Sequence, residues 1–166
     1  MHVLIATSGV LSPAPVVEFT RPLLGQNGRV TLITVIEVPR AFLDALDAAD
    51  GRPLDVDAQG LREEAVSRYL VERGRQIVEP VRIALEAARI PSEVRFVEGS
   101  DAAAGITHLA DEIDAEVVVL GATRPIFNRE AWESVSARVM LESARPVLVI
   151  PAPPRDEADG PRPGLE

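Results

Sequence analysis

Residues 115–121 read Ala-Glu-Val-Val-Val-Leu-Gly, and this stretch decides the fold class of the chain. Four aliphatic residues follow one another here, without the alternation of apolar and polar residues that a strand with one wet face shows. Uninterrupted runs of Val, Ile and Leu are typical of parallel strands that are covered on both faces. The stretch therefore predicts a buried parallel strand at residues 116–120.

Four other short segments have the same character. Three of them are dominated by Val, Ile and Leu. The fourth, at residues 93–97, alternates less cleanly, but Pro91 and Gly99 mark its ends. The five predicted strands are residues 3–7, 30–36, 93–97, 116–120 and 147–150.

Helical patterns lie between these strands. Ser12 can cap a helix over residues 13–24. Apolar residues spaced by threes and fours predict a long helix over residues 61–88. Pro80 removes one backbone donor from that helix, so we expect a kink or a break there.

Two further helices complete the pattern. Ser100 can cap a helix that runs through Ile113, with Asp101 in its first turn, and a last helix is predicted over residues 131–141. Because strands and helices alternate along the chain, we predict a single α/β domain. Its core would be an open, doubly wound parallel sheet with helices on both faces.

Two regions do not fit the core pattern. Residues 37–60 hold five Asp and two Pro, and predict a flexible acidic excursion with one short helix around residues 42–48. Residues 153–166 are rich in Pro and acidic side chains, and predict a disordered tail. The folded domain would then cover residues 1–152.

The composition excludes several classes of function. The formal charge of −9 disfavours nucleic-acid and anionic-membrane partners, because both need a basic surface. All 17 basic side chains are Arg and there is no Cys, so lysine, thiolate and disulfide chemistry are absent. No apolar run approaches the ~20 residues that span a bilayer, and no signal-like segment opens the sequence, so we expect a cytoplasmic protein.

Several segments together resemble the universal stress protein family. The opening Val-Leu-Ile-Ala-Thr-Ser-Gly at residues 3–9 is similar to the family's first strand and turn. The similar segments of the second half are Glu-Val-Arg-Phe-Val-Glu-Gly-Ser-Asp at 93–101, Ile106, the strand at 115–121, Ser-Val-Ser-Ala-Arg-Val-Met at 134–140 and Arg-Pro-Val-Leu-Val-Ile-Pro at 145–151. The resemblance covers about residues 2–152.

This resemblance implies a Rossmann-like fold of the adenine-nucleotide alpha-hydrolase type, with five parallel strands in the order 3-2-1-4-5. It also implies a homodimer that pairs through the last strand, and it leaves room for other protein partners. The residues that would make the dimer contact are Pro146, Val147, Leu148, Val149 and Ile150. Pro151 would end the pairing.

Some family members bind ATP through a loop with the pattern Gly, two residues, Gly, nine residues, Gly and then Ser or Thr. Small residues there let backbone amides approach phosphate oxygens. Gly121 holds the first position here, whereas Arg124 and Glu133 stand at the second and third. Glu133 would repel a triphosphate, and Ser8 replaces the acidic residue that usually meets the adenosine. The resemblance therefore implies a weakened loop, in which Arg124 and Arg129 could hold an anion through their side chains instead.

If ATP or another adenine nucleotide binds, with Mg²⁺, the resemblance also indicates where. Val35 and Val97 would line the base, and Ser134 and Ser136 would contact phosphate. The full candidate set is Ala6, Ser8, Val35, Val97, Gly99, Gly121, Thr123, Arg124, Arg129, Ser134 and Ser136.

Each of these residues has a plainer interpretation that the sequence leaves open. Ser134 and Ser136 can cap the following helix, and Gly121 can make a simple turn. The two loop arginines can pair with nearby carboxylates. His2 and His108 have no companions at metal-ligand spacing, so we expect both to be structural.

Three functions follow from these observations. The first is a dimeric regulatory or stress-response module without catalytic turnover, which we favour because no nucleophile–base pair is recognisable. The second is an adenine-nucleotide-binding stress protein that uses the modified loop at residues 121–136. The third is a nucleotide hydrolase of the same fold, in which Asp101 or Glu98 would hold a metal ion near the phosphates.

Overall fold

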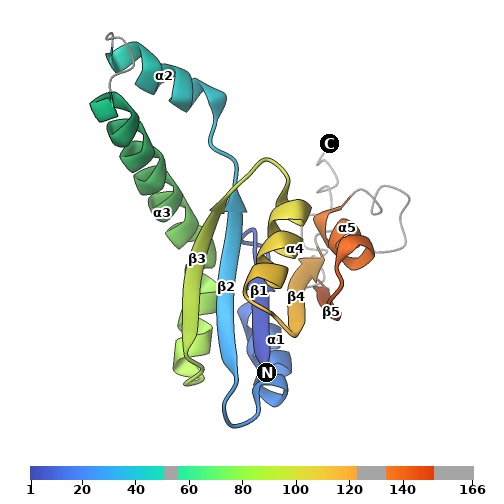
Figure 1. Cartoon of the computed structure of the whole chain (residues 1–166). Helices are drawn as coiled ribbons and strands as arrows, with labels where there is room; N and C mark the ends of the chain where they lie inside the picture. The colour runs from blue at the N-terminus through green and yellow to red at the C-terminus, as the bar shows by residue number, and fades with distance from the viewer. Residues whose placement is uncertain (51–55, 123–133, 152–166) are drawn as a thin grey trace, which may run out of the picture.

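Five parallel strands form the centre of the molecule (Figure 1). The computed structural model describes residues 1–50, 56–122 and 134–151. The strands pair in the order β3-β2-β1-β4-β5, so the sheet order implied by the resemblance is confirmed. Their bounds are β1 (His2–Ala6), β2 (Arg29–Ile36), β3 (Ser92–Glu98), β4 (Val117–Ala122) and β5 (Val147–Pro151).

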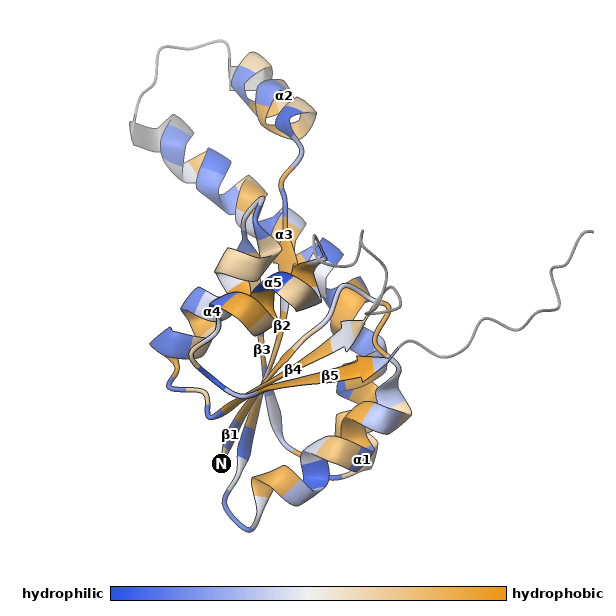
Figure 2. Cartoon of the chain, turned by 90° about the vertical axis from the view of Figure 1, so that its right-hand side faces the viewer, coloured by the Kyte–Doolittle hydropathy of each residue, from blue (hydrophilic) through white to orange (hydrophobic). Residues whose placement is uncertain are grey.

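Alternate residues of the central strand β1 face opposite layers of the molecule. Val3 and Ile5 belong to a core cluster with residues of α1 (Pro13–Leu24) and α3 (Val56–Ala87). Leu4 and Ala6 belong to a second cluster with residues of α4 (Ala102–Glu112) and α5 (Val135–Glu142). Figure 2 shows the strands as the most consistently apolar elements, with α1 on one side and α4 and α5 on the other. Both faces of the sheet are covered, which explains why its strands lack polar alternation.

The acidic excursion is largely helical. Its first part is α2 (Arg40–Asp50), longer than the short helix predicted there, and α3 begins at Val56 rather than at residue 61. The two helices project beyond the sheet as an arm (Figure 1), in which the rings of Phe42 and Tyr69 lie 5.0 Å apart. The frequent Asp and Pro residues suggested a flexible loop. Instead, Pro39 lies just before α2, where its carbonyl accepts a hydrogen bond from the Phe42 N–H.

The predicted break at Pro80 does not occur, because α3 is one helix of 32 residues. Pro80 is exposed, while Val78, Val81 and Leu85 on the opposite side are buried in the core. Burial of that apolar stripe compensates for one missing backbone donor. In the described part of the chain, no helix combines the length and the apolar character that crossing a membrane requires.

The cap of α4 is also shifted by one residue from the prediction. Asp101, rather than Ser100, is the N-cap, and its Oδ1 accepts a hydrogen bond of 3.1 Å from the Ala104 N–H. A carboxylate satisfies a first-turn N–H and also interacts favourably with the positive end of the helix dipole. The tail at residues 153–166 and the predicted start of the last helix lie outside the described residues.

Candidate functional site

A cavity of about 470 Å³ opens at the carboxyl ends of β1 and β4. The strand order reverses between these two strands, and open α/β sheets bind ligands at such switch points. The volume lies within the range of small-molecule sites, about 300–1,000 Å³. The lining residues are Ala6, Thr7, Ser8, Val10, Leu11, Val35, Ala102, Ile106, Leu120, Gly121, Ser134, Val135 and Ser136.

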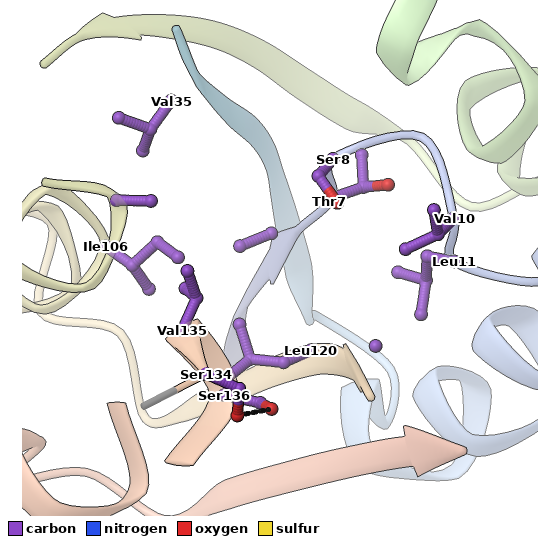
Figure 3. A pocket seen from close by; sticks show the side chains of 13 residues that line it. Thr7, Ser8, Val10, Leu11, Val35, Ile106, Leu120, Ser134, Val135 and Ser136 are labelled. Atoms are coloured by element: carbon purple, nitrogen blue, oxygen red, sulfur yellow. Dashed lines mark hydrogen bonds between the residues drawn. The ribbon is translucent and has the colours of Figure 1, made fainter. Parts of the chain in front are cut away.

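The turn after β1 forms one wall of this cavity (Figure 3). Thr7 continues the sheet by donating its backbone N–H to the Ile33 carbonyl at 3.0 Å, and its Oγ1 accepts the Gly9 N–H at 3.0 Å. Gly9 has a φ of +93°, a conformation that other residues rarely adopt, so this turn requires glycine. The turn holds Ser8, Val10 and Leu11 at the cavity.

The start of α5 forms the floor of the cavity. Ser134 is the N-cap, and its Oγ accepts the Ala137 N–H at 3.3 Å. The Oγ atoms of Ser134 and Ser136 lie 3.2 Å apart, and both residues line the cavity (Figure 3). The two readings of Ser134 are therefore compatible, because a hydroxyl that accepts one bond as a cap still has a proton to donate.

An apolar wall faces the turn across the cavity. Val35, from the end of β2, and Ile106, from α4, lie on the side opposite to Val10 and Leu11 (Figure 3). None of the described residues that line the cavity carries a charged side chain. The cavity thus combines apolar surface with four side-chain hydroxyls.

Six of the predicted site residues line the cavity together: Ala6, Ser8, Val35, Gly121, Ser134 and Ser136. Val97 and Gly99 do not line it. Val97 packs with Val35 against the core cluster beneath α4, and the Gly99 N–H donates to the Ile36 carbonyl at 3.0 Å, which extends the sheet. Thr123, Arg124 and Arg129 lie outside the described residues.

The sequence reasoning missed the other lining residues, which are Thr7, Val10, Leu11, Ala102, Ile106, Leu120 and Val135. Thr7, Val10 and Leu11 were within reach of prediction, because the turn after the first strand borders the switch point in this strand order. Ile106 could not have been predicted as a lining residue, because in the sequence it looks like any other apolar core residue on a helix that covers the sheet.

Gly121 lies directly against Leu11. A Cβ atom added at Gly121 would lie 3.1 Å from Leu11 Cδ1 and 3.6 Å from Leu11 Cα. The first of these contacts is tighter than most packing contacts, so a larger residue here would require the Leu11 side chain to shift.

A salt bridge beside the cavity joins α4 to α5. Arg138 donates from Nη1 and Nη2 to the two carboxylate oxygens of Asp101, both at 2.9 Å. The Arg138 hydrogen bonds, and then the Ala104 N–H, lower the pKa of Asp101. Both oxygens of Asp101 are therefore engaged in hydrogen bonds within the chain. Within the described segments, no cluster of three or more His, Cys, Asp or Glu could hold a metal ion.

The predicted dimer residues lie at the edge of the sheet. Val147, Leu148 and Val149 are half-buried in the chain itself, and Pro146 is exposed. Ile150 is only 2% exposed because it belongs to the core cluster under α1, so its side chain serves its own chain. Within the chain, Pro151 is in register with Ala122 of β4, so β5 itself extends to Pro151.

His2 is a structural residue at the opposite end of the sheet. Its Nδ1 lies 3.0 Å from the Ile113 carbonyl, which can only accept, so Nδ1 carries the proton. Nε2 then accepts from the Thr31 hydroxyl at 2.9 Å. Burial, followed by the nearby Arg29 charge, lowers the pKa of His2.

Known proteins resemble the chain in sequence pattern and in structure. The family model described as the universal stress protein family matches residues 1–151. A universal stress protein in complex with cAMP is 20% identical, with a TM-score of 0.58, and the match covers 92% of this chain and 98% of that chain. A universal stress protein from Archaeoglobus fulgidus is 16% identical, with a TM-score of 0.59, and the match covers 90% and 92%. At 15% identity, an AMP-bound protein of the family from Arabidopsis thaliana matches with a TM-score of 0.53 and coverage of 93% and 93%. A comparison with curated proteins gives no match.

Proposed function

The chain belongs to the universal stress protein family, and from that premise we propose that it is a regulatory binding module without catalytic turnover, whose cavity takes an adenine mononucleotide. The observation that carries the proposal is the cavity at the switch point between β1 and β4. Six residues anticipated for a nucleotide meet there. The AMP and cAMP complexes of the two relatives support the choice of ligand class.

The character of the cavity favours one phosphate group over three. Among the described residues that line it, the side-chain donors are hydroxyls and none carries a positive charge. Multiple phosphates carry several negative charges and need Arg, Lys or a metal ion when they are taken out of water. A single phosphate needs only a few hydrogen bonds and a favourable dipole. The Glu at position 133, where the family pattern has Gly, also argues against a triphosphate.

In the arrangement that we propose, the two ends of the mononucleotide contact different walls. The base packs against the apolar side chains of Val35 and Ile106. The phosphate lies over Ser134 and Ser136 at the N-terminus of α5, where backbone N–H groups and the helix dipole attract an anion.

Calorimetric titration and thermal unfolding test this function. Adenosine, AMP, cyclic AMP, ADP and ATP would each be added with and without Mg²⁺. A ligand that binds only the folded chain must raise the melting temperature, and we expect AMP or cyclic AMP to give the largest rise. If no adenine compound shifts the transition even at millimolar concentration, the site is not a nucleotide site.

A homodimer through β5 is the second element of the proposal. β5 is an edge strand, and the α5 residues Met140 and Leu141 beside it are 40% and 70% exposed. Exposed strand edges next to apolar side chains are suited to pairing with another chain. Sedimentation of Val149→Asp tests this contact, because a charge at the half-buried edge should release monomers. A dimer of unchanged mass would place the interface elsewhere.

A further inference from the structure

We infer that Leu11 determines which adenine nucleotide the cavity accepts, because with Val10 it forms an apolar stop beyond the first phosphate. The inference rests on the function proposed above and adds to it a residue that selects the ligand. Neither residue belongs to the loop at residues 121–136 that the family pattern emphasises.

Leu11 has two roles in the structure. It is only 5% exposed and belongs to the core cluster with Ile5 and Val16, so its position is fixed by packing. It also lines the cavity and covers the end of β4 at Gly121. A rigid apolar side chain therefore occupies the space that a glycine at this point would otherwise leave open.

The order of the walls shows what Leu11 would meet. Figure 3 places Val35 and Ile106 on one side of the cavity and Val10 and Leu11 on the opposite side, with the two serines of the α5 start at its floor. In the arrangement that we propose, the base lies on the first side, the phosphate lies at the serines, and a second phosphate would extend toward Val10 and Leu11.

The apolar side chains of Val10 and Leu11 are a poor environment for a second phosphate. Charged oxygens pressed against Leu11 would lose hydration without gaining hydrogen bonds from its side chain, which is strongly unfavourable. Adenosine, AMP and cyclic AMP do not reach that wall in the proposed arrangement. The cavity would thus discriminate between AMP and ADP because Leu11 disfavours a second phosphate, and not because a favourable contact with that phosphate is missing.

The experiment compares two identical substitutions in the same core cluster. Leu11 lies just before α1, and Leu24 is the last residue of α1. Both are buried in this cluster, but of the two only Leu11 lines the cavity. The ratio of dissociation constants for ADP and AMP would be measured by calorimetry for the unaltered chain, Leu11→Ala and Leu24→Ala. Because both dissociation constants in a ratio are measured on the same variant, a general loss of stability affects both and cancels from the ratio.

We expect the unaltered chain to prefer AMP over ADP by about tenfold or more, and Leu11→Ala to reduce that preference by about tenfold. Leu24→Ala should keep it. If AMP binds and Leu11→Ala leaves the preference unchanged, the inference is wrong while the proposed function stands. If the unaltered chain binds no adenine compound, the proposed function fails and this inference fails with it.

A second variant covers the case in which Leu11→Ala does not fold. Val10 lies on the same wall and is 49% exposed, so Val10→Arg leaves the core intact. The guanidinium would offer a partner to a second phosphate, and we expect ADP affinity to rise relative to AMP affinity. An unchanged ratio in this variant would also contradict the inference.

Discussion

At the amino end of the sheet, polar side chains bond to one another, whereas at the carboxyl end they surround a cavity. His2 hydrogen-bonds through both ring nitrogens, and its backbone N–H donates to Glu116 Oε2 at 2.7 Å. Arg95 pairs with Glu93 at 2.7 Å and with Glu112 at 3.5 Å. The part of the other end that the structure describes has a cavity lined by hydroxyls and apolar groups, with no charged residue among them.

This difference separates two uses of polar residues in one fold. Groups that satisfy each other inside the chain contribute to stability, and substitutions there should alter unfolding but not binding. Hydroxyls at a cavity retain bonding capacity, and substitutions there should do the reverse. If the two ends are independent, substitutions at the amino end should leave ligand affinity unchanged, and substitutions at the cavity should leave the unfolding transition unchanged.

Among the polar substitutions, the largest effect on stability is expected for His2→Ala. The change leaves the buried Thr31 hydroxyl and the Ile113 carbonyl without their partner, which should lower the free energy of unfolding by about 1–3 kcal/mol. Urea denaturation measures this loss. The exposed His108 is the matched control, and His108→Ala should stay within about 0.5 kcal/mol. Weakened AMP binding in His2→Ala would show that the two ends are coupled.

The largest effect on binding among polar substitutions is expected for Ser136→Ala. Loss of one hydroxyl at the proposed phosphate position should weaken AMP about tenfold, with little change in the unfolding transition. Calorimetry measures the affinity, and Ser67→Ala on the exposed surface of α3 is the control. Equal AMP affinities of the two variants would show that the phosphate does not bind at the start of α5.

The pH dependence of stability should come from the amino end. The pKa of His2 is lowered in the folded chain, so the unfolded chain binds more protons near the ordinary pKa of about 6.5. Stability is then fully present above that pH and declines as the pH falls below it. Arg29 opposes protonation of the ring, whereas Glu93 and Glu116 favour it. His2→Gln should flatten the curve of melting temperature against pH in this window, and a curve of unchanged slope would assign the dependence to other groups.

The smallest effect is expected for Arg95→Gln. Arg95 is 39% exposed and its carboxylate partners are more exposed still, so loss of its ion pairs should change the free energy of unfolding by only about 0–1 kcal/mol. AMP affinity should not change. A larger destabilisation, insensitive to salt, would mean that the charged end contributes more to the fold than surface ion pairs usually do.

The sheet was predictable because its signal is local and repeated. Four of the five strands are rich in Val, Ile and Leu, Pro91 and Gly99 mark the ends of the fifth, and the resemblance supplied the order in which the strands pair. The helix over residues 13–24 also agrees with the structure to the residue. The arm was predicted only as one short helix, because the Asp and Pro content of residues 37–60 outweighed the apolar stripe of α2.

The site was predictable only in part. Ser8, Gly121, Ser134 and Ser136 stand in segments that resemble a known pattern, and the structure brings them to one cavity. Leu11 carried no such signal, since its contact with Gly121 joins positions 110 residues apart and depends on the packing of the turn after β1. A contact of that kind follows from tertiary structure and not from any local pattern.

The long helix α3 spans two environments. From Gly74 onward it packs on the sheet, where Val78, Val81 and Leu85 are buried, whereas the described side chains from Gln59 to Arg73 include none that is buried. Apart from the donor that Pro80 lacks, its backbone ladder runs through both halves, yet the halves differ in the tertiary contacts that hold them closed. Amide hydrogens of the outer half should therefore exchange with solvent through local fraying, while those of the inner half should wait for global unfolding. Hydrogen exchange along this one helix would then distinguish a segment that opens locally from a segment that opens only when the whole chain unfolds.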